Sequence, residues 1–294
     1  MKRHWELVLD QKALLGESPS WDAHNEVLYW IDSLKGYLHI YDPTKKTNRT
    51  IELGEQVGCV VPKSENEVAL ALKSGYHVLN LQTEKCYPIV DPEKDYLDNS
   101  FNDGKCDPKG RFWAGTVNTK DAYKFTGSLY CLNMDGKVER ALDSVGCSNG
   151  ITWSPDYKTM YYIDTLAFNI KAFDYCLSSG AISKGRIVVK IPEQYKLPDG
   201  MSADTEGKLW VAHWDAAKVC RWNPENGELL EYIDFPAPRI TSCVFGGKNL
   251  NELYVTSARD GLDEETIKKY PFSGGLFRVK MAVRGLPTFA FKMR

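Results

Sequence analysis

Short apolar runs of five to seven residues recur along the whole chain, rich in Val, Ile, Tyr, Phe and Trp, with clusters of Gly, Asp, Asn and Pro between them. Runs of this length bounded by turn-forming residues are typical of β-strands. Helical apolar periodicity with capping residues is missing over any long stretch, and only Leu262 to Tyr270 is expected to form a short helix, within a loop. The pattern therefore predicts a chain that is close to all-β.

One kind of apolar run repeats six times, and its centres are 41, 42, 49, 48 and 44 residues apart. We expect it to be a penultimate, half-polar strand that is preceded by a turn and followed by a further strand. The six runs are VLYWIDS, VALALKS, RFWAGTV, MYYIDTL, LWVAHWD and LYVTSAR, centred on Trp30, Ala71, Trp113, Tyr162, Trp210 and Tyr254. Repeats of about this period with four strands each are the signature of a β-propeller. The sequence predicts an all-β fold, a six-bladed β-propeller with four-stranded blades and a central channel.

A circular array of blades must also be closed. We expect residues 1–294 to form a single propeller domain in which the amino-terminal segment HWELVLD pairs as the outer strand of the last blade. The segment TFAFKM near the carboxyl terminus competes for the same position, and the sequence does not decide between them.

Oxygen-bearing side chains recur at one phase of the repeat. Glu17 and Asn149 each lie 13 residues before their blade's central anchor, and Asn102 and Asp199 each lie 11 residues before theirs. Side chains alternate faces with a period of two, so both spacings place these residues on the same face of the innermost strand, which lines the channel. The alternative is that Asn149-Gly150, Asp199-Gly200 and Asp103-Gly104 are ordinary turn dipeptides.

If these side chains converge, Glu17, Asn149 and Asp199 offer only oxygen ligands, which suit a hard divalent ion such as Ca²⁺, Mg²⁺ or Mn²⁺. Three protein ligands leave positions open for water and substrate, and such a site can polarise a carbonyl oxygen and activate water for hydrolysis. Asp199 could both bind the metal and take the proton from the attacking water.

Composition and charge exclude several other classes. The formal net charge is −2 and no basic stripe is present, so we expect no nucleic-acid partner. No apolar run is long enough to span a membrane, and acidic residues interrupt the amino-terminal segment before a secretory signal could form, so we expect a cytoplasmic protein that does not contact membranes. Eight cysteines, of which the nearest neighbours are 16 positions apart, favour buried free thiols over disulfides or a zinc knuckle. His213 is the one histidine expected to approach the channel, although packing within a blade is the more ordinary role for it.

The order and spacing of several short motifs resemble one known family. These motifs are Gly16-Glu17-Ser18-Pro19, Asn102-Asp103-Gly104-Lys105, Gly110-Arg111-Phe112-Trp113-Ala114-Gly115-Thr116, Ser148-Asn149-Gly150, Pro198-Asp199-Gly200-Met201 and Leu253-Tyr254-Val255-Thr256-Ser257-Ala258. Along nearly its whole length the chain resembles the family of regucalcin (senescence marker protein), gluconolactonase and luciferin-regenerating enzyme.

The resemblance implies one divalent metal, Ca²⁺ foremost and otherwise Zn²⁺, Mn²⁺ or Mg²⁺, held by Glu17, Asn149 and Asp199. It implies that Asn102 and Asp103 contact substrate or metal-bound water and that Asp199 is the base. The implied activity is metal-dependent hydrolysis of the ester bond of a lactone, typically an aldonolactone, by a monomer or weak homodimer.

Two departures concern the wall that would select the substrate. Ser100 stands where sugar-lactone members of the family carry Arg, and Thr119 and Lys120 replace an acidic residue. Ser100 and Lys120 are therefore candidate substrate-binding residues for a different lactone or for reduced sugar activity. Two other functions stay open at this point, namely hydrolysis of organophosphate esters on the same metal and a non-enzymatic calcium-binding propeller.

Overall fold

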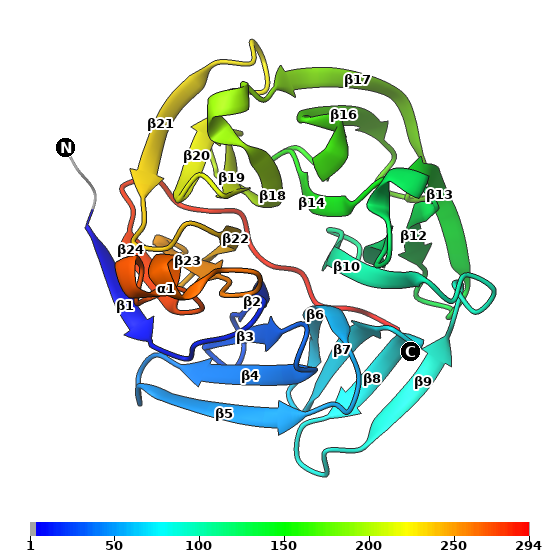
Figure 1. The fold of residues 1–294 in the computed structure, drawn as a ribbon. Helices are drawn as coiled ribbons and strands as arrows, with labels where there is room; N and C mark the ends of the chain where they lie inside the picture. Colours follow the sequence, from blue (N-terminus) through cyan, green and yellow to red (C-terminus); the bar gives the residue numbers. More distant parts are fainter. Residues whose placement is uncertain (1–3, 294) are drawn as a thin grey trace.

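The computed structural model describes residues 4–293, and within this range the chain forms six four-stranded antiparallel sheets arranged around a central axis (Figure 1). The predicted six-bladed β-propeller is confirmed. The innermost strand of each blade is β2 (Gly16–Asp22), β6 (Val57–Ser64), β10 (Asn99–Cys106), β14 (Ser148–Trp153), β18 (Leu197–Ala203) and β22 (Ile240–Gly246).

The six repeating apolar runs form the second strand of each blade. These are β3 (Val27–Asp32), β7 (Glu67–Leu72), β11 (Phe112–Asn118), β15 (Thr159–Asp164), β19 (Leu209–Trp214) and β23 (Glu252–Ser257). The expectation of penultimate, half-polar strands is wrong. Two further strands lie outside each of them in its sheet, and the residues of these second strands are buried on both faces, because neighbouring blades cover both sides of the sheet.

The third strands follow next in five blades and after a longer loop in the sixth. They are β4 (Tyr37–Asp42), β8 (Gly75–Asn80), β12 (Gly127–Leu132), β16 (Asn169–Tyr175), β20 (Lys218–Trp222) and β24 (Leu276–Lys280). The loop before β24 holds α1 (Glu264–Lys269), which confirms the short helix expected there. Asp263 caps α1 by accepting a hydrogen bond from the Thr266 N–H at 2.7 Å.

The outermost strands are more polar because they face solvent. They are β5 (Thr47–Glu52), β9 (Cys86–Val90), β13 (Val138–Val145), β17 (Ile182–Lys190), β21 (Leu229–Asp234) and, in the sixth blade, β1 (Trp5–Leu9). β1 pairs antiparallel with β24, with Trp5 opposite Val279. Residues from the two ends of the described chain thus share one blade.

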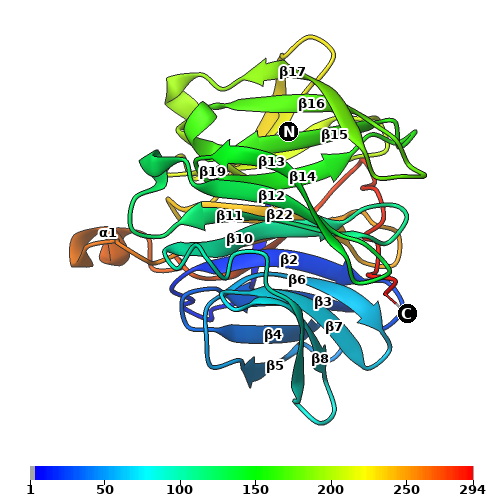
Figure 2. The same cartoon turned by 90° about the vertical axis from the view of Figure 1, so that its right-hand side faces the viewer.

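The two faces of the propeller differ. We call the mouth face the one on which the innermost strands begin; it also carries α1 and the short 3₁₀ turns η1 (Ala122–Lys124), η2 (Thr165–Ala167) and η3 (Glu193–Tyr195). The carboxyl-terminal segment, residues 281–293, crosses the opposite face, where Leu286 N–H donates to Ala203 and Phe291 N–H donates to Pro62. Figure 2 shows α1 and the carboxyl terminus on opposite sides of the molecule. TFAFKM therefore lies across the base of the channel and forms no strand.

Apolar contacts between blades form the core. In one cluster Trp210 of the fifth blade packs on Phe245 of the sixth, with ring centroids 6.1 Å apart. All eight cysteines are free, as expected, although Cys86 and Cys176 are exposed. No helix among residues 4–293 is long and apolar enough to cross a membrane.

Candidate metal and substrate site

Every innermost strand contains a β-bulge or irregularity in its pairing with the second strand. The pairing register shifts between Phe101 and Asp103, between Ser148 and Ile151, and between Pro198 and Met201. Asn102, Asn149 and Asp199 are therefore left without a cross-strand partner, and Glu17 is the last paired residue before the shift in β2. Bulges re-aim side chains, and here they occur at the same level of the channel in all six blades.

Three carboxyl groups from three blades interact at this level. Glu17, Asp103 and Asp199 are all buried. Burial raises the pKa of Glu17 well above its usual value, and the negative charges of Asp199 and Asp103 raise it further. Burial and the charge of Asp103 likewise raise the pKa of Asp199. The channel mouth thus holds concentrated and poorly compensated negative charge.

Asn149 completes this group. Its Nδ2 donates to the Thr165 hydroxyl at 3.1 Å, and that hydroxyl donates to the Pro198 carbonyl at 2.9 Å. A hydrogen bond from Asn149 also partly offsets the raised pKa of Asp199. The Asn149 Oδ1 atom, in contrast, is buried and has no hydrogen-bond partner. A buried amide oxygen without a partner is costly, and such an atom calls for an explanation.

A divalent cation fits both features, because it would take up the unpartnered amide oxygen and neutralise facing carboxylates. Within residues 4–293 no three Asp, Glu, His or Cys side chains form a metal-binding group by themselves. The set that fits is therefore mixed and consists of the Glu17 and Asp199 carboxylates with the Asn149 amide.

Asn102 and Asp103 lie beside this set on β10. Asn102 Nδ2 donates to the Ser148 carbonyl at 2.8 Å and lies 3.7 Å from Cys147 Sγ, so the amide is fixed against the fourth blade. Asp103 Oδ1 accepts the Gly104 N–H at 2.7 Å. Both residues thus have defined orientations next to the candidate ligands.

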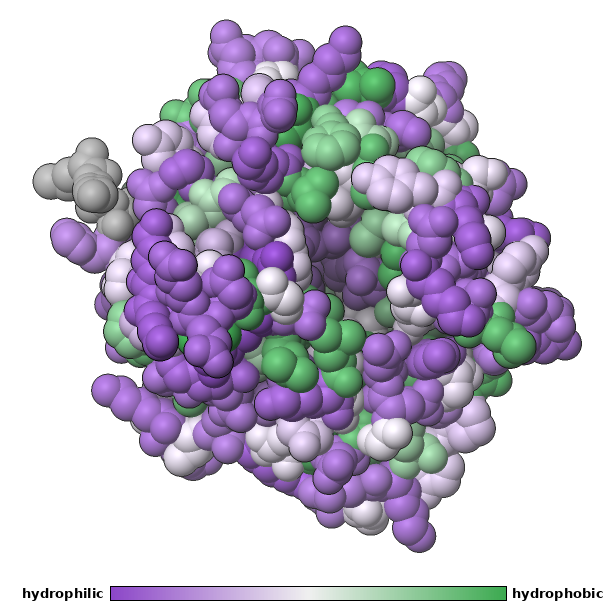
Figure 3. All heavy atoms as spheres, in the orientation of Figure 1, coloured by the Kyte–Doolittle hydropathy of each residue, from purple (hydrophilic) through white to green (hydrophobic). Residues whose placement is uncertain are grey.

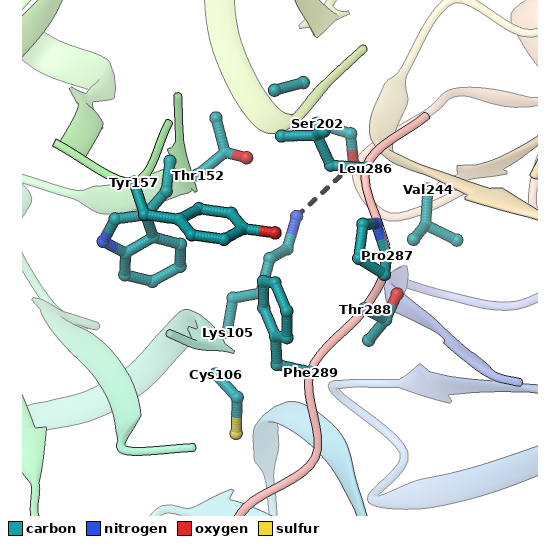
Figure 4. A pocket seen from close by; sticks show the side chains of 12 residues that line it. Lys105, Cys106, Thr152, Tyr157, Ser202, Val244, Leu286, Pro287, Thr288 and Phe289 are labelled. Carbon is teal, nitrogen blue, oxygen red and sulfur yellow. Dashed lines mark hydrogen bonds between the residues drawn. The ribbon is translucent and has the colours of Figure 1, made fainter. Parts of the chain in front are cut away.

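Below the site, Lys105 occupies the channel axis. Its Nζ donates to the Met201 carbonyl at 2.7 Å and lies 3.4 Å from Ser202 Oγ. Lys105 lines a cavity of about 30 Å³ to which the carboxyl-terminal segment contributes Leu286 to Phe289. Figure 4 shows these side chains around the Lys105 ammonium. The positive charge of Lys105 lowers the pKa of Asp103, although burial outweighs it. This end of the channel has room for about one water molecule.

Three other candidates have their contacts with residues outside this group. Ser100 is buried within β10 and pairs with Val117. Lys120 extends into solvent and forms an ion pair with Asp98 at 2.6 Å. His213 is buried inside the fifth blade, where its Nε2 accepts a hydrogen bond from Trp222 Nε1 at 3.3 Å.

Sequence reasoning missed Thr165, Cys147 and Lys105. Each makes a contact to another blade that the spacing within one blade does not reveal: Cys147 to Asn102, Lys105 to Met201, and Thr165 to Pro198. Thr165 directly follows the recurring strand run MYYID, and nothing in the repeat marks its hydroxyl as the partner of Asn149.

Comparison with known proteins gives a consistent result. Residues 15–259 match the SMP-30/Gluconolactonase/LRE-like region. Regucalcin of Oryctolagus cuniculus is 38% identical over 291 residues, and the putative sugar lactone lactonase YvrE of Bacillus subtilis (strain 168) is 36% identical over 285; in each case 97% of both chains is covered.

Solved structures agree. A luciferin-regenerating enzyme superposes with a TM-score of 0.92 at 32% identity, covering 99% of this chain and 100% of that one. Regucalcin from Agrobacterium tumefaciens, described as a calcium-binding protein, gives a TM-score of 0.94 at 25% identity over 99% and 98% of the two chains. The resemblance inferred from the motifs is confirmed, and the chain belongs to the SMP-30/gluconolactonase/LRE-like family.

Proposed function

We propose that this protein is a divalent-metal-dependent lactonase. The observation that carries the proposal is the buried group of Glu17, Asn149 and Asp199 at the channel mouth, in which an amide oxygen has no partner and two carboxyl groups repel each other. Membership of a gluconolactonase-containing family and the sugar lactone lactonase name of one relative support the choice of reaction.

Glu17, Asn149 and Asp199 would hold the ion, with Ca²⁺ as the first candidate because all three ligands are oxygens. The bound ion supplies a Lewis acid for the ester carbonyl. Asp199 takes the proton from the water whose oxygen adds to the acyl carbon and later returns it. The ring C–O bond breaks, the departing oxygen receives that proton, and a hydroxy acid results.

Asn102 and Asp103 are the proposed substrate contacts beside the ion, and the bond from Asn102 to the Ser148 carbonyl supports this by fixing the amide next to the candidate ligands. Ser100 and Lys120 belong to the proposed substrate wall. Contact from Lys120 requires its ammonium to leave Asp98, which an exposed ion pair permits at small cost.

The test combines metal analysis of the purified protein with a screen of sugar and aliphatic lactones at several added metals and in EDTA. Lactone turnover that depends on added metal supports the proposal if Asp199→Asn abolishes it. The exposed control Asp135→Asn should retain this turnover. Metal binding and stabilisation without turnover of any lactone would overturn it and favour a calcium-binding propeller. A higher kcat/KM for organophosphates than for lactones would instead assign the site to phosphorus esters.

A further inference from the structure

Large apolar side chains are exposed around the channel mouth. In the described part of the chain they include Leu14, Leu34, Tyr96, Leu97, Tyr123, Phe125 and Phe168. All of these lie on the loops of the mouth face, whereas the opposite face exposes only Met134 among the described large apolar residues and the remainder lie on outer strands. Figure 3 shows hydrophobic side chains bordering a central hollow whose deeper atoms are hydrophilic.

We call these exposed apolar side chains, together with the half-buried Leu166, the apolar rim. Part of the rim contacts the backbone just before Asn149. A Cβ atom at Gly146 would lie 2.9 Å from Leu166 Cδ1 and 3.0 Å from Phe125 Cε1, so both side chains pack over this glycine. Gly146 comes three residues before Asn149, and Leu166 directly follows Thr165, which holds the Asn149 amide. The apolar side chains at the channel mouth are therefore adjacent to the polar residues of the candidate site.

The backbone at two rim positions is unusual for aromatic residues. Phe125 and Phe168 end the turns η1 and η2 in the left-handed region, with φ of 52° and 50°. Gly or Asn adopts this conformation at lower cost, and the two phenylalanines are 42% and 43% exposed. Both rings thus stay partly open to solvent at the channel mouth, where they are available to a bound molecule.

A ligand that matches both the polar residues of the candidate site and the apolar side chains around the channel mouth has a polar ester group deep in the channel and an apolar group above it. We propose that the lactone taken by this site carries an alkyl or aryl substituent that lies against Leu97, Phe125 and Leu166. This inference rests on the proposed lactonase function and specifies its substrate class. A flat protein-binding surface is less consistent with the rim, because the Asp98–Lys120 ion pair interrupts it and its apolar residues surround a hollow.

The experiment uses the full chain with Ca²⁺ and a series of γ-lactones that differ only in the length of an n-alkyl substituent, from methyl to heptyl. Burial of each methylene predicts a rise in kcat/KM of about two- to fourfold. The rise should come through KM, because the substituent binds equally well in the ground and transition states.

Variants locate the effect. Phe125→Asn keeps a residue that tolerates the left-handed region, and Leu97→Ser changes a side chain that is 80% exposed, so both should fold. Each substitution should lower the ratio of kcat/KM for the heptyl lactone to kcat/KM for the methyl lactone at least twofold, with the ratio measured within each variant. Leu230→Ser on β21 is the matched control and should leave the ratio unchanged.

The outcomes separate the two proposals. Failure to turn over any lactone with any metal overturns the lactonase function and this inference together. A kcat/KM that is constant, or that falls, as the alkyl substituent of the lactone lengthens overturns this inference alone. A Leu97→Ser variant that alters self-association and leaves the ratio unchanged also overturns it, and identifies the rim as a contact between copies.

Discussion

Asn149 donates a hydrogen bond to the Thr165 hydroxyl, and the same hydroxyl donates to the carbonyl of Pro198, the residue before Asp199. One threonine side chain thus fixes the spacing between two candidate metal ligands on adjacent blades. Such outer-shell partners commonly affect metal affinity by 10- to 100-fold.

We therefore expect Thr165→Val to weaken Ca²⁺ binding by about 10-fold or more, since Asn149 loses the partner that orients its amide. Thr165→Ser keeps the hydroxyl and should bind nearly as well. Calorimetric titration of both variants with Ca²⁺ tests this, and equal affinities would remove Thr165 from the site.

Asp199→Asn should have opposite effects with and without metal. In EDTA it should raise the free energy of unfolding near neutral pH, because it removes one of the buried carboxylates that raise each other's pKa. With Ca²⁺ the variant should lose the metal-dependent stabilisation that the parent protein shows. Urea unfolding of the parent and the variant, in EDTA and with Ca²⁺, measures this reversal in their relative stability. Asp135→Asn on the opposite face serves as the control.

Asp107 should be among the most sensitive polar positions outside the site. Its carboxylate accepts hydrogen bonds from Arg111 at 2.9 Å, Trp113 at 3.1 Å and Tyr175 at 2.7 Å, and it joins the third blade to the fourth. Asp107→Ala leaves the buried Arg111 charge unpaired and should cost about 3–5 kcal/mol. In a double-mutant cycle with Arg111→Met the losses should be less than additive.

The buried histidines predict acid sensitivity. Burial lowers the pKa of His213 and of His39 to about 4. Below about pH 6.5 the unfolded chain takes up protons that the folded protein excludes, so the free energy of unfolding falls between pH 6.5 and 4, by on the order of 3 kcal/mol for each histidine.

His213→Gln retains an acceptor for Trp222 and does not titrate, so it should flatten this pH dependence. Denaturant unfolding at a series of pH values measures the slope. His24→Gln, at an exposed turn, should leave the slope unchanged; an equal slope for His213→Gln would show that this residue does not contribute.

The carboxyl-terminal segment should contribute to stability through one aromatic ring. Phe291 is buried against Phe112 with centroids 6.0 Å apart. Phe291→Ala should lower the free energy of unfolding by about 3–5 kcal/mol, whereas its exposed neighbour Lys292→Ala should have a small effect. Thermal unfolding followed by near-ultraviolet circular dichroism distinguishes the two.

The blade number follows from the sequence because each second strand is apolar on both faces and the turns around it are regular. The position of the site is partly readable for the same reason, since Glu17, Asn149 and Asp199 hold one phase of the repeat. Alternation alone does not explain their convergence, however. A bulge leaves Asn149 and Asp199 unpaired, and nothing in SNGITW or LPDGMSA indicates which residue the ladder skips.

Contacts between blades are harder to predict. Lys120 is a candidate for the substrate wall because it stands in place of the family's acidic residue, but the sequence does not reveal its ion pair with Asp98. The apolar rim is similarly hidden, because its residues come from loops of different blades and no single loop is apolar. The sequence repeat therefore predicts the strands of each blade well and the contacts between blades poorly.

The pairing of β1 with β24 also bears on how the protein is made. Residues 5–9 leave the ribosome early but have no sheet to join until residues 276–280 have been synthesised. Loop closure over such a sequence separation is slow. Completion of the ring must therefore wait for residues 276–280, and until they are made the first blade has one face without its neighbour. Nascent chains stalled before residue 276 should be the form of this protein most in need of chaperones.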